Sequence, residues 1–141
     1  MEGKEKKAQE VYSEFQILTQ HIKQLQSQLE VITQQRAELN ATSNSLDEIA
    51  KVKEGKEVFV PLSSGIFVKA NIKNTSDMLV NVGANVVVKK DLASAKMLIQ
   101  TQMEEMKKIQ KRMLEELEKL TNHAANLEAQ LQGLISEEQT S

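Results

Sequence analysis

The stretch from Val58 to Lys90 places the strongest constraint on the fold, because it is the only part of the chain without helical periodicity. It contains four short runs rich in Val, Ile and Phe, separated by turn-forming residues at 63–65, 74–77 and 83–85. That pattern is typical of consecutive β-hairpins. The sequence on each side of it has the spacing of a long helix. The simplest chain path therefore runs out along one helix, through the strands, and back along the other.

This path predicts an α+β fold, a long antiparallel coiled-coil helical hairpin with two β-hairpins at its base. We expect an N-terminal coiled-coil helix over residues 1–54, a β-hairpin oligomerisation segment over 55–90 and a C-terminal coiled-coil helix over 91–141, together forming one domain. Aromatic residues make up only 3% of the chain, so a thick globular core is not expected. A composition dominated by Glu, Lys, Gln, Leu and Ala with heptad spacing favours long paired helices.

The first predicted helix has apolar residues in a 4-3 heptad rhythm, and every d position from 11 to 46 is apolar. Toward its carboxyl end the a positions become polar or small, at Arg36, Ser43 and Ala50. Gly55 is the expected C-cap. A single amphipathic helix of this length gains most of its stability from packing, so it requires a partner helix.

The second predicted helix supplies that partner. Asp91 is its expected N-cap, and the helix runs to about Ser136, with Lys96 and Gln110 as polar exceptions in its apolar seam. One antiparallel register pairs Phe15 with Leu127, Ile22 with Leu120, Leu29 with Met113 and Ala50 with Leu92, and a register shifted by one heptad is also open. In either register the two chain ends meet at the tip farthest from the β segment.

Several apolar residues near this tip lie off the seam. Tyr12 and Ile135 fall at e positions and Ile17 at a c position, so a two-helix hairpin cannot bury all three. A tip that exposes apolar surface is a candidate binding site. The alternative is that these are ordinary seam residues with a few scattered exposed neighbours, as in many proteins without such a site. The candidate tip residues are Val11, Tyr12, Phe15, Ile17, Leu18, Leu127, Leu131, Leu134 and Ile135.

The strand segment is predicted to be a surface for oligomerisation. Pro61 makes the first strand an edge strand or interrupts it, and Phe67 is an apolar exception on a mostly polar face. Four short strands have open edges and too little core, so we expect them to pair with strands of other chains. The alternative is a self-contained small sheet capped by the two helix ends. The strand residues expected at the oligomerisation surface are Val60, Ile66, Val68, Ile72, Val80, Val82, Val86 and Val88.

No motif for bond-making chemistry is present. The chain has no phosphate-binding loop, no dinucleotide fingerprint and no nucleophile elbow, so we expect neither an enzyme nor a cofactor. His21 and His123 both fall at g positions and are the only histidines, whereas a stable metal site needs three or four ligands. We therefore predict no metal site.

Charge and hydropathy narrow the partners further. The formal net charge is −2, and the densest basic cluster, at 107–112, is flanked by glutamates at 104, 105, 115 and 116, so a nucleic-acid partner is not expected. No apolar run approaches the roughly 20 residues that span a bilayer, so no membrane partner is expected either. The absence of cysteine fits a reducing compartment. A cytoplasmic protein is the predicted outcome.

The strand segment resembles a known family. The runs VFVPLSSGIFVKANI and MLVNVGANVVVKK, flanked by two heptad helices of equal length, are similar to the α-class subunit of prefoldin, an ATP-independent co-chaperone. In that family the α class carries two β-hairpins and the β class one, and the four runs match the α class. The chain departs from the family pattern in its turns, with Ser63 and Ser64 before Gly65, and with Asn85 where a second glycine often stands.

This resemblance implies a hexamer of two α-class and four β-class prefoldin subunits on a β-barrel base built from the hairpins. It also implies an ATP-independent holdase that binds unfolded polypeptides at the coiled-coil tips and delivers them to a group II chaperonin. Two other interpretations stay open. One is a structural or tethering coiled-coil assembly protein that binds no unfolded client. The other is a helical arm that docks a nucleic acid, which the mixed charges at 104–116 disfavour.

Overall fold

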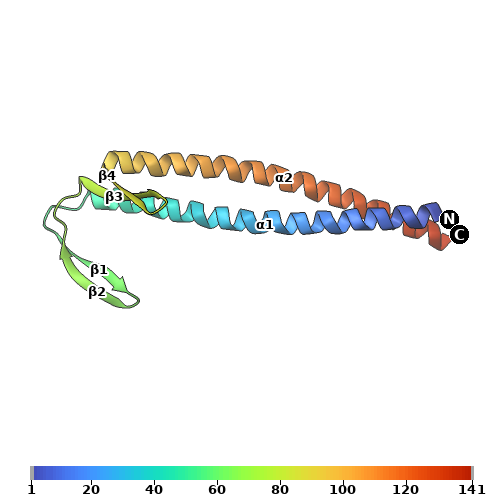
Figure 1. Cartoon of the computed structure of the whole chain (residues 1–141), viewed down its shortest axis with the longest axis horizontal. Helices are drawn as coiled ribbons and strands as arrows, with labels where there is room; N and C mark the ends of the chain where they lie inside the picture. Colours follow the sequence, from blue (N-terminus) through green and yellow to red (C-terminus); the bar gives the residue numbers. More distant parts are fainter. Residues whose placement is uncertain (1, 141) are drawn as a thin grey trace. The chain divides into compact units, whose positions relative to one another are not determined.

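The computed structural model describes residues 2–140 and contains six elements, shown in Figure 1. Met1 and Ser141, which begin the first predicted segment and end the third, lie outside the described residues. The order is α1 (Glu2–Ala50), β1 (Glu57–Ser63), β2 (Ile66–Asn71), β3 (Asp77–Gly83), β4 (Val86–Asp91) and α2 (Leu92–Thr140). Two long helices in a hairpin and two antiparallel β-hairpins confirm the predicted α+β fold.

The chain divides into two units, which are described separately. The helical unit contains Met1–Gln35 and Met106–Ser141, and the strand unit contains Arg36–Glu105. The helical unit therefore consists of the first part of α1 and the last part of α2. The strand unit holds the other ends of both helices and all four strands.

In the helical unit, α1 and α2 lie side by side and pack through the predicted seam (Figure 1). Val11, Leu18 and Leu127 form a buried cluster, against which five partly buried neighbours pack. The amide Nε2 of Gln110 donates a hydrogen bond of 3.3 Å to the hydroxyl of Thr33. These contacts agree with the unshifted antiparallel register, the one that pairs Phe15 with Leu127. They also give Gln110, a polar residue at an a position, a partner on the opposite helix. The five neighbours are Phe15, Ile22, Leu120, Ala124 and Leu131.

In the strand unit the seam is more polar and less covered. The ammonium of Lys96, the other polar a position, forms an ion pair with Asp47 of α1, also in the unshifted register. Ala95 is the buried apolar residue of this unit among those the structure describes. Ile49 is half-buried where Ala50 was the predicted seam residue, so the apolar stripe drifts by one position at the end of α1.

The end of α1 corrects the predicted boundary. The helix ends at Ala50 rather than near residue 54, and Gly55 is not its C-cap. The backbone N–H groups of Lys51 and Val52 donate to the carbonyls three residues earlier, which tightens and closes the last turn. Gly55, with a φ of +81°, lies in the following turn and donates its N–H to the carbonyl of Ile72.

Each β-hairpin forms its own two-stranded antiparallel sheet, β1 with β2 and β3 with β4. β1 continues through Pro61, which pairs with Phe67, and in a two-stranded sheet it is an edge strand, so the first of the two predicted alternatives holds. The register shifts just after Pro61, between Pro61 and Ser63. The second sheet shifts in the same way between Asn81 and Gly83. A two-residue turn closes the second hairpin with Ala84 and Asn85 at φ of 51° and 61°, which is the left-handed region that type I′ turns require.

The two hairpins are copies of one pattern, displaced by 20 positions. Glu57 pairs with Asn71 and Asp77 pairs with Asp91, and every other pair of the two registers is displaced equally. Each hairpin also carries one exposed ion pair on equivalent residues, Lys69 with Glu57 at 3.2 Å and Lys89 with Asp77 at 3.4 Å. A surface that one hairpin offers to a partner is therefore offered in similar form by the other.

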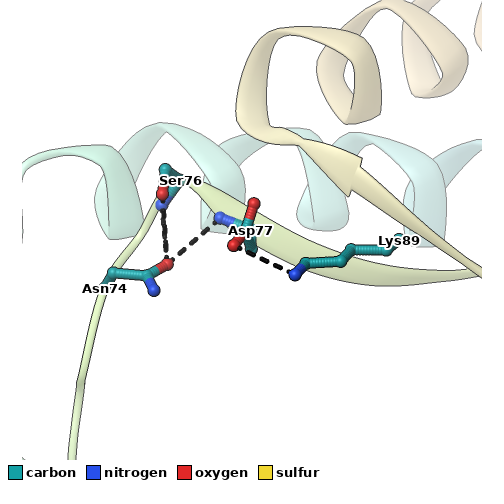
Figure 2. Close-up of polar contacts among 4 residues, drawn as sticks. All are labelled: Asn74, Ser76, Asp77 and Lys89. Carbon is teal, nitrogen blue, oxygen red and sulfur yellow. Dashed lines mark hydrogen bonds and ion pairs between the residues drawn. The ribbon is translucent and has the colours of Figure 1, made fainter.

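A hydrogen-bonded turn joins the two hairpins (Figure 2). The side-chain carbonyl of Asn74 accepts hydrogen bonds of 3.2 Å from the backbone N–H groups of Ser76 and Asp77 and from the Ser76 hydroxyl. An asparagine whose side chain accepts hydrogen bonds from backbone N–H groups two and three residues later stabilises a turn by itself, without pairing to a strand. The predicted turn at 74–77 is confirmed.

Asp91 ends β4 and caps α2. Its carboxylate accepts a 2.7 Å hydrogen bond from the backbone N–H of Ser94, so the predicted N-cap is confirmed. Hydrogen bonds from the Ser94 hydroxyl and the Ser94 N–H hold the pKa of Asp91 below its usual value. From this cap α2 continues to Thr140, four residues beyond the predicted end.

Candidate functional site

The nine predicted tip residues fall into three classes of exposure in the helical unit. Val11, Leu18 and Leu127 are buried, and Leu127 retains only 4% of its accessible surface. Phe15, Leu131 and Leu134 are half-buried along the same seam. Tyr12, Ile17 and Ile135 are exposed, at 53%, 69% and 52%. The seam is thus filled by its own heptad residues, and the off-seam residues are left on the surface.

The exposed residues of α1 border shallow grooves in the helix surface. One groove is uncharged and lined by Tyr12, Phe15 and Ile17, together with the polar residues Ser13, Gln16, Thr19 and Gln20. Gln16 donates a 3.1 Å hydrogen bond to the Tyr12 hydroxyl, which holds the phenol ring against its own helix. Amide and hydroxyl groups beside apolar side chains can contact both the side chains and the backbone of an extended polypeptide.

A second groove on α1 carries charge. It is lined by Lys6, Glu10, Glu14 and Ile17, together with Gln9 and Ser13, so Ile17 and Ser13 belong to both grooves. His123 of α2 lies beside this groove, with its Nε2 3.2 Å from the Glu14 carboxylate. His123 therefore contacts a glutamate of the opposite helix. Within residues 2–140, no three His, Cys, Asp or Glu side chains come together as a possible metal site.

The strand registers define two faces on each hairpin. Residues directly opposite one another share a face, so Val58, Val60, Val68 and Ala70 form an apolar face of the first hairpin. The other face carries the Glu57–Lys69 ion pair. On that face the Lys69 ammonium lies 5.9 Å from the centroid of the Phe59 ring, a distance at which a cation and an aromatic face attract.

The predicted oligomerisation residues concentrate on the apolar faces. Val60 lies opposite Val68, and Val80 lies opposite Val88 at the equivalent place in the second hairpin. Ile72 differs, because it lies just beyond β2, where its N–H donates to the Lys56 carbonyl. Val60, Ile66, Val68, Val82, Val86 and Val88 are exposed, and Val80 and Ile72 are half-buried.

Much of the apolar surface on the hairpins was not predicted from the sequence. Phe59 and Phe67 are exposed on the charged face of the first hairpin, and Leu79 and Val87 are exposed at related positions of the second. Leu62 is exposed at the register shift, where a bulge re-aims the side chain. The alternation of apolar and polar residues assigns one face of each strand to solvent. Apolar residues on that face, such as Phe67, were the signal from which this extra apolar surface could have been predicted.

The family model for "Prefoldin subunit" matches residues 18–137. The chain is 31% identical over 136 residues to the prefoldin subunit alpha of Methanobrevibacter smithii, covering 96% of this chain and 92% of that relative. The chain belongs to the prefoldin family, in its alpha class. Membership of this family makes it a chaperone-type subunit.

Two further matches agree with this assignment. The prefoldin subunit alpha of Thermofilum pendens is 29% identical over 118 residues, covering 84% of this chain and 92% of the relative. A cryo-EM structure of filamentous PFD from Methanocaldococcus jannaschii has the same fold, with a TM-score of 0.59 and 22% identity. That match covers 92% of this chain and 98% of the other.

Within residues 2–140, no helix is long and apolar enough to cross a membrane.

The two hairpin turns that depart from the family pattern place different residues in the left-handed conformation. Gly65, with a φ of +81°, provides the left-handed residue of the first hairpin turn, so Ser63 and Ser64 are not needed for it. In the second turn Asn85 takes a left-handed conformation in place of glycine, which asparagine tolerates better than most residues. Ala84 takes the same conformation without that help.

Proposed function

We propose that this chain is the alpha-class subunit of a cytoplasmic, ATP-independent holdase. It binds unfolded polypeptides at the tip of its helical hairpin and delivers them to a group II chaperonin. It assembles with beta-class prefoldin subunits into a hexamer of two alpha and four beta chains. No nucleotide and no catalysis are required, because holding a client makes and breaks no covalent bond.

One observation carries the client-binding part of this proposal. The seam of the helical unit is filled by buried residues such as Leu18 and Leu127, yet Tyr12, Ile17 and Ile135 remain exposed. Burial of apolar surface drives association, so exposed apolar residues beside a complete seam are available for a client. Val11, Leu18 and Leu127 reach a client only where the two helices separate, so the three exposed residues make the first contact.

The strand faces support the assembly part. A two-stranded hairpin is marginal in water by itself, and both hairpins expose apolar residues such as Val60 and Val88. Covering those faces with strands of other chains would bury this surface. An assembly would also place several weakly binding tips on one base, which raises the affinity for a client through effective concentration.

Light scattering of a denatured model protein diluted into the chain tests this function, without nucleotide, with the chain alone and with a beta-class subunit. We expect suppression of aggregation that strengthens with the partner. The triple variant Tyr12→Ser, Ile17→Ser, Ile135→Ser should lose several-fold of that activity while circular dichroism and complex size stay unchanged.

A matched triple variant provides the control. Val31, Ile109 and Leu114 are also apolar residues on the surface of the same unit, exposed at 52%, 40% and 51%, but are not among the predicted tip residues. Replacing these three by Ser should leave suppression intact. Equal loss in both variants would remove the tip assignment. No suppression by a complex whose assembly has been verified would instead favour the tethering coiled coil.

A further inference from the structure

The two grooves on α1 meet at Ile17, and their linings differ in charge. Ile17 is the most exposed of the tip residues, at 69%, and belongs to both grooves. On one side of it the lining is uncharged, with Tyr12 and Phe15. On the other side the lining includes Glu10 and Glu14. A client segment that contacts Ile17 therefore meets apolar surface on one side and carboxylates on the other.

We propose that this groove selects unfolded segments in which an apolar side chain is followed or preceded closely by Lys or Arg. This inference rests on the proposed client-binding function and names the class of client. The apolar side chain would contact Ile17 and the Tyr12 groove. The basic side chain would lie over Glu10 and Glu14, whose two negative charges exceed the single positive charge of Lys6 in the same lining.

The helix geometry fixes the spacing of such a segment. Glu14 lies three residues and Glu10 seven residues before Ile17, which is about 4.5 Å and about 10 Å along the helix axis. An extended chain advances about 3.3 Å per residue. The basic residue should therefore lie one to three positions from the apolar residue. Lys6 lies about 16 Å from Ile17, so a basic residue five positions away meets a like charge instead.

The charges around this groove come from both helices. On α1 they are Lys6, Glu10 and Glu14, and on α2 His123 lies against Glu14. The Glu14 carboxylate is half-exposed, so it can accept a further hydrogen bond from a client ammonium or guanidinium while it contacts His123. Exposed ion pairs contribute little each, so the selection acts as a preference of several-fold among clients.

Fluorescence anisotropy with three labelled peptides tests the proposal on the full chain, alone and assembled with a beta-class subunit. The first peptide has two Leu with Lys two positions away, and the second has the same composition with Lys moved to six positions. The third has Glu in place of the near Lys. We expect the first to bind about threefold to tenfold more tightly than the third, with the second between them. This preference should disappear in about 0.5 M salt, where charges are strongly screened.

Variants identify the residues responsible. Glu10→Gln with Glu14→Gln should abolish the preference for the near Lys and leave binding of the third peptide equal or tighter. Glu115→Gln with Glu118→Gln removes two exposed charges of the same unit outside the groove and should leave the preference unchanged. Circular dichroism checks that both variants stay helical.

The outcomes separate this inference from the proposed function. If all three peptides bind equally, or if the preference survives in Glu10→Gln/Glu14→Gln, the basic-client inference is wrong and apolar capture stands. If no peptide binds to the assembled complex, and the Tyr12/Ile17/Ile135 variant still suppresses aggregation, client capture at this tip is itself wrong.

Discussion

The helical unit buries most of its apolar seam within the chain, whereas the strand unit leaves most of its apolar side chains exposed. In the helical unit, Val11, Leu18, Leu25, Leu29 and Leu127 are buried by the chain itself. In the strand unit only Ala95 reaches that degree of burial among the described residues, and both hairpins expose Val, Ile, Leu and Phe side chains. A coiled-coil seam can be completed within one chain, because each helix covers the other. A two-stranded sheet has two faces and two edges, so one chain cannot cover it.

This contrast explains why apolar exposure has a different meaning in the two units. On the hairpins it is broad and repeated at equivalent positions of two copies, as expected for a surface that other subunits cover. On the helices it is sparse and lies off a finished seam. The first kind of surface suits permanent assembly, and the second suits weak, reversible contacts with many clients.

The largest expected effect comes from charging the apolar strand face. Val60→Lys with Val68→Lys places two ammonium groups opposite one another on that face, and burying unpaired charges costs several kcal/mol each. We expect association with a beta-class subunit to weaken by more than about 100-fold in sedimentation velocity. Val80→Lys with Val88→Lys should do the same if the two hairpins are equivalent.

The opposite face provides the control for this experiment. Leu79→Lys with Val87→Lys changes exposed apolar residues on the face that already carries Lys89. The effect on association should be much smaller. If this variant weakens assembly more than Val80→Lys with Val88→Lys, the assignment of the two faces is reversed.

The next effect tests the completeness of the helical seam. Leu127→Ala removes a side chain that is 4% exposed and should lower the free energy of unfolding by about 2–4 kcal/mol, measured by urea denaturation. Ile135→Ala, eight residues later and 52% exposed, should change it by less than about 0.5 kcal/mol. Similar losses at both positions would mean that Ile135 packs in the seam rather than being available to a client.

A smaller effect concerns the turn of the second hairpin. Ala84 adopts a φ of 51°, which costs an L-residue about 1–2 kcal/mol, whereas glycine adopts it freely. Ala84→Gly should stabilise the protein by about 0.5 kcal/mol after the extra entropy of the unfolded chain is subtracted. Ser64→Gly at the equivalent position of the first hairpin, which has no such φ, should destabilise. Thermal unfolding of both variants measures the difference.

The smallest effect is the pH dependence of the α2 cap. The pKa of Asp91 is lowered in the folded state by hydrogen bonds from Ser94, so the ionised carboxylate stabilises the folded chain. This contribution is complete above the unfolded-state pKa and is lost as the pH falls through the folded-state pKa. Asp91→Asn should therefore lower Tm near pH 7 and have little effect near pH 2.5. An equal drop in Tm at both pH values would show that the charge is not involved.

The sequence predicted most of the fold because each element has a strong local signal. Heptad spacing located both helices, and the turns at 74–77 and 83–85 have residues that favour those conformations. The polar a positions Lys96 and Gln110 could not be paired from spacing alone, since a shift of one heptad keeps the same apolar layers. Their partners Asp47 and Thr33 on α1 distinguish the registers.

The end of α1 and the surface residues were harder to predict. Gly55 looked like a helix cap, yet the helix closes at Ala50 through backbone bonds that any residue except proline can donate. Heptad position separates Tyr12 and Ile17 from the seam, and the i, i+4, i+7 spacing of Glu10, Glu14 and Ile17 places those three on one face of α1. Neither pattern shows that His123 of α2 lies against Glu14. Strand alternation likewise could not place Leu62, because the register shift at Pro61 breaks the alternation.

Hydrogen exchange with and without a beta-class subunit tests the central contrast between the two units most directly. We predict that amides of residues 57–91 become strongly protected on assembly, because other chains cover the hairpins. Amides around residues 11–18 and 127–135 should keep the protection that they have in the chain alone. Protection that appears at the helix tip on assembly, with the hairpins unchanged, would contradict the account.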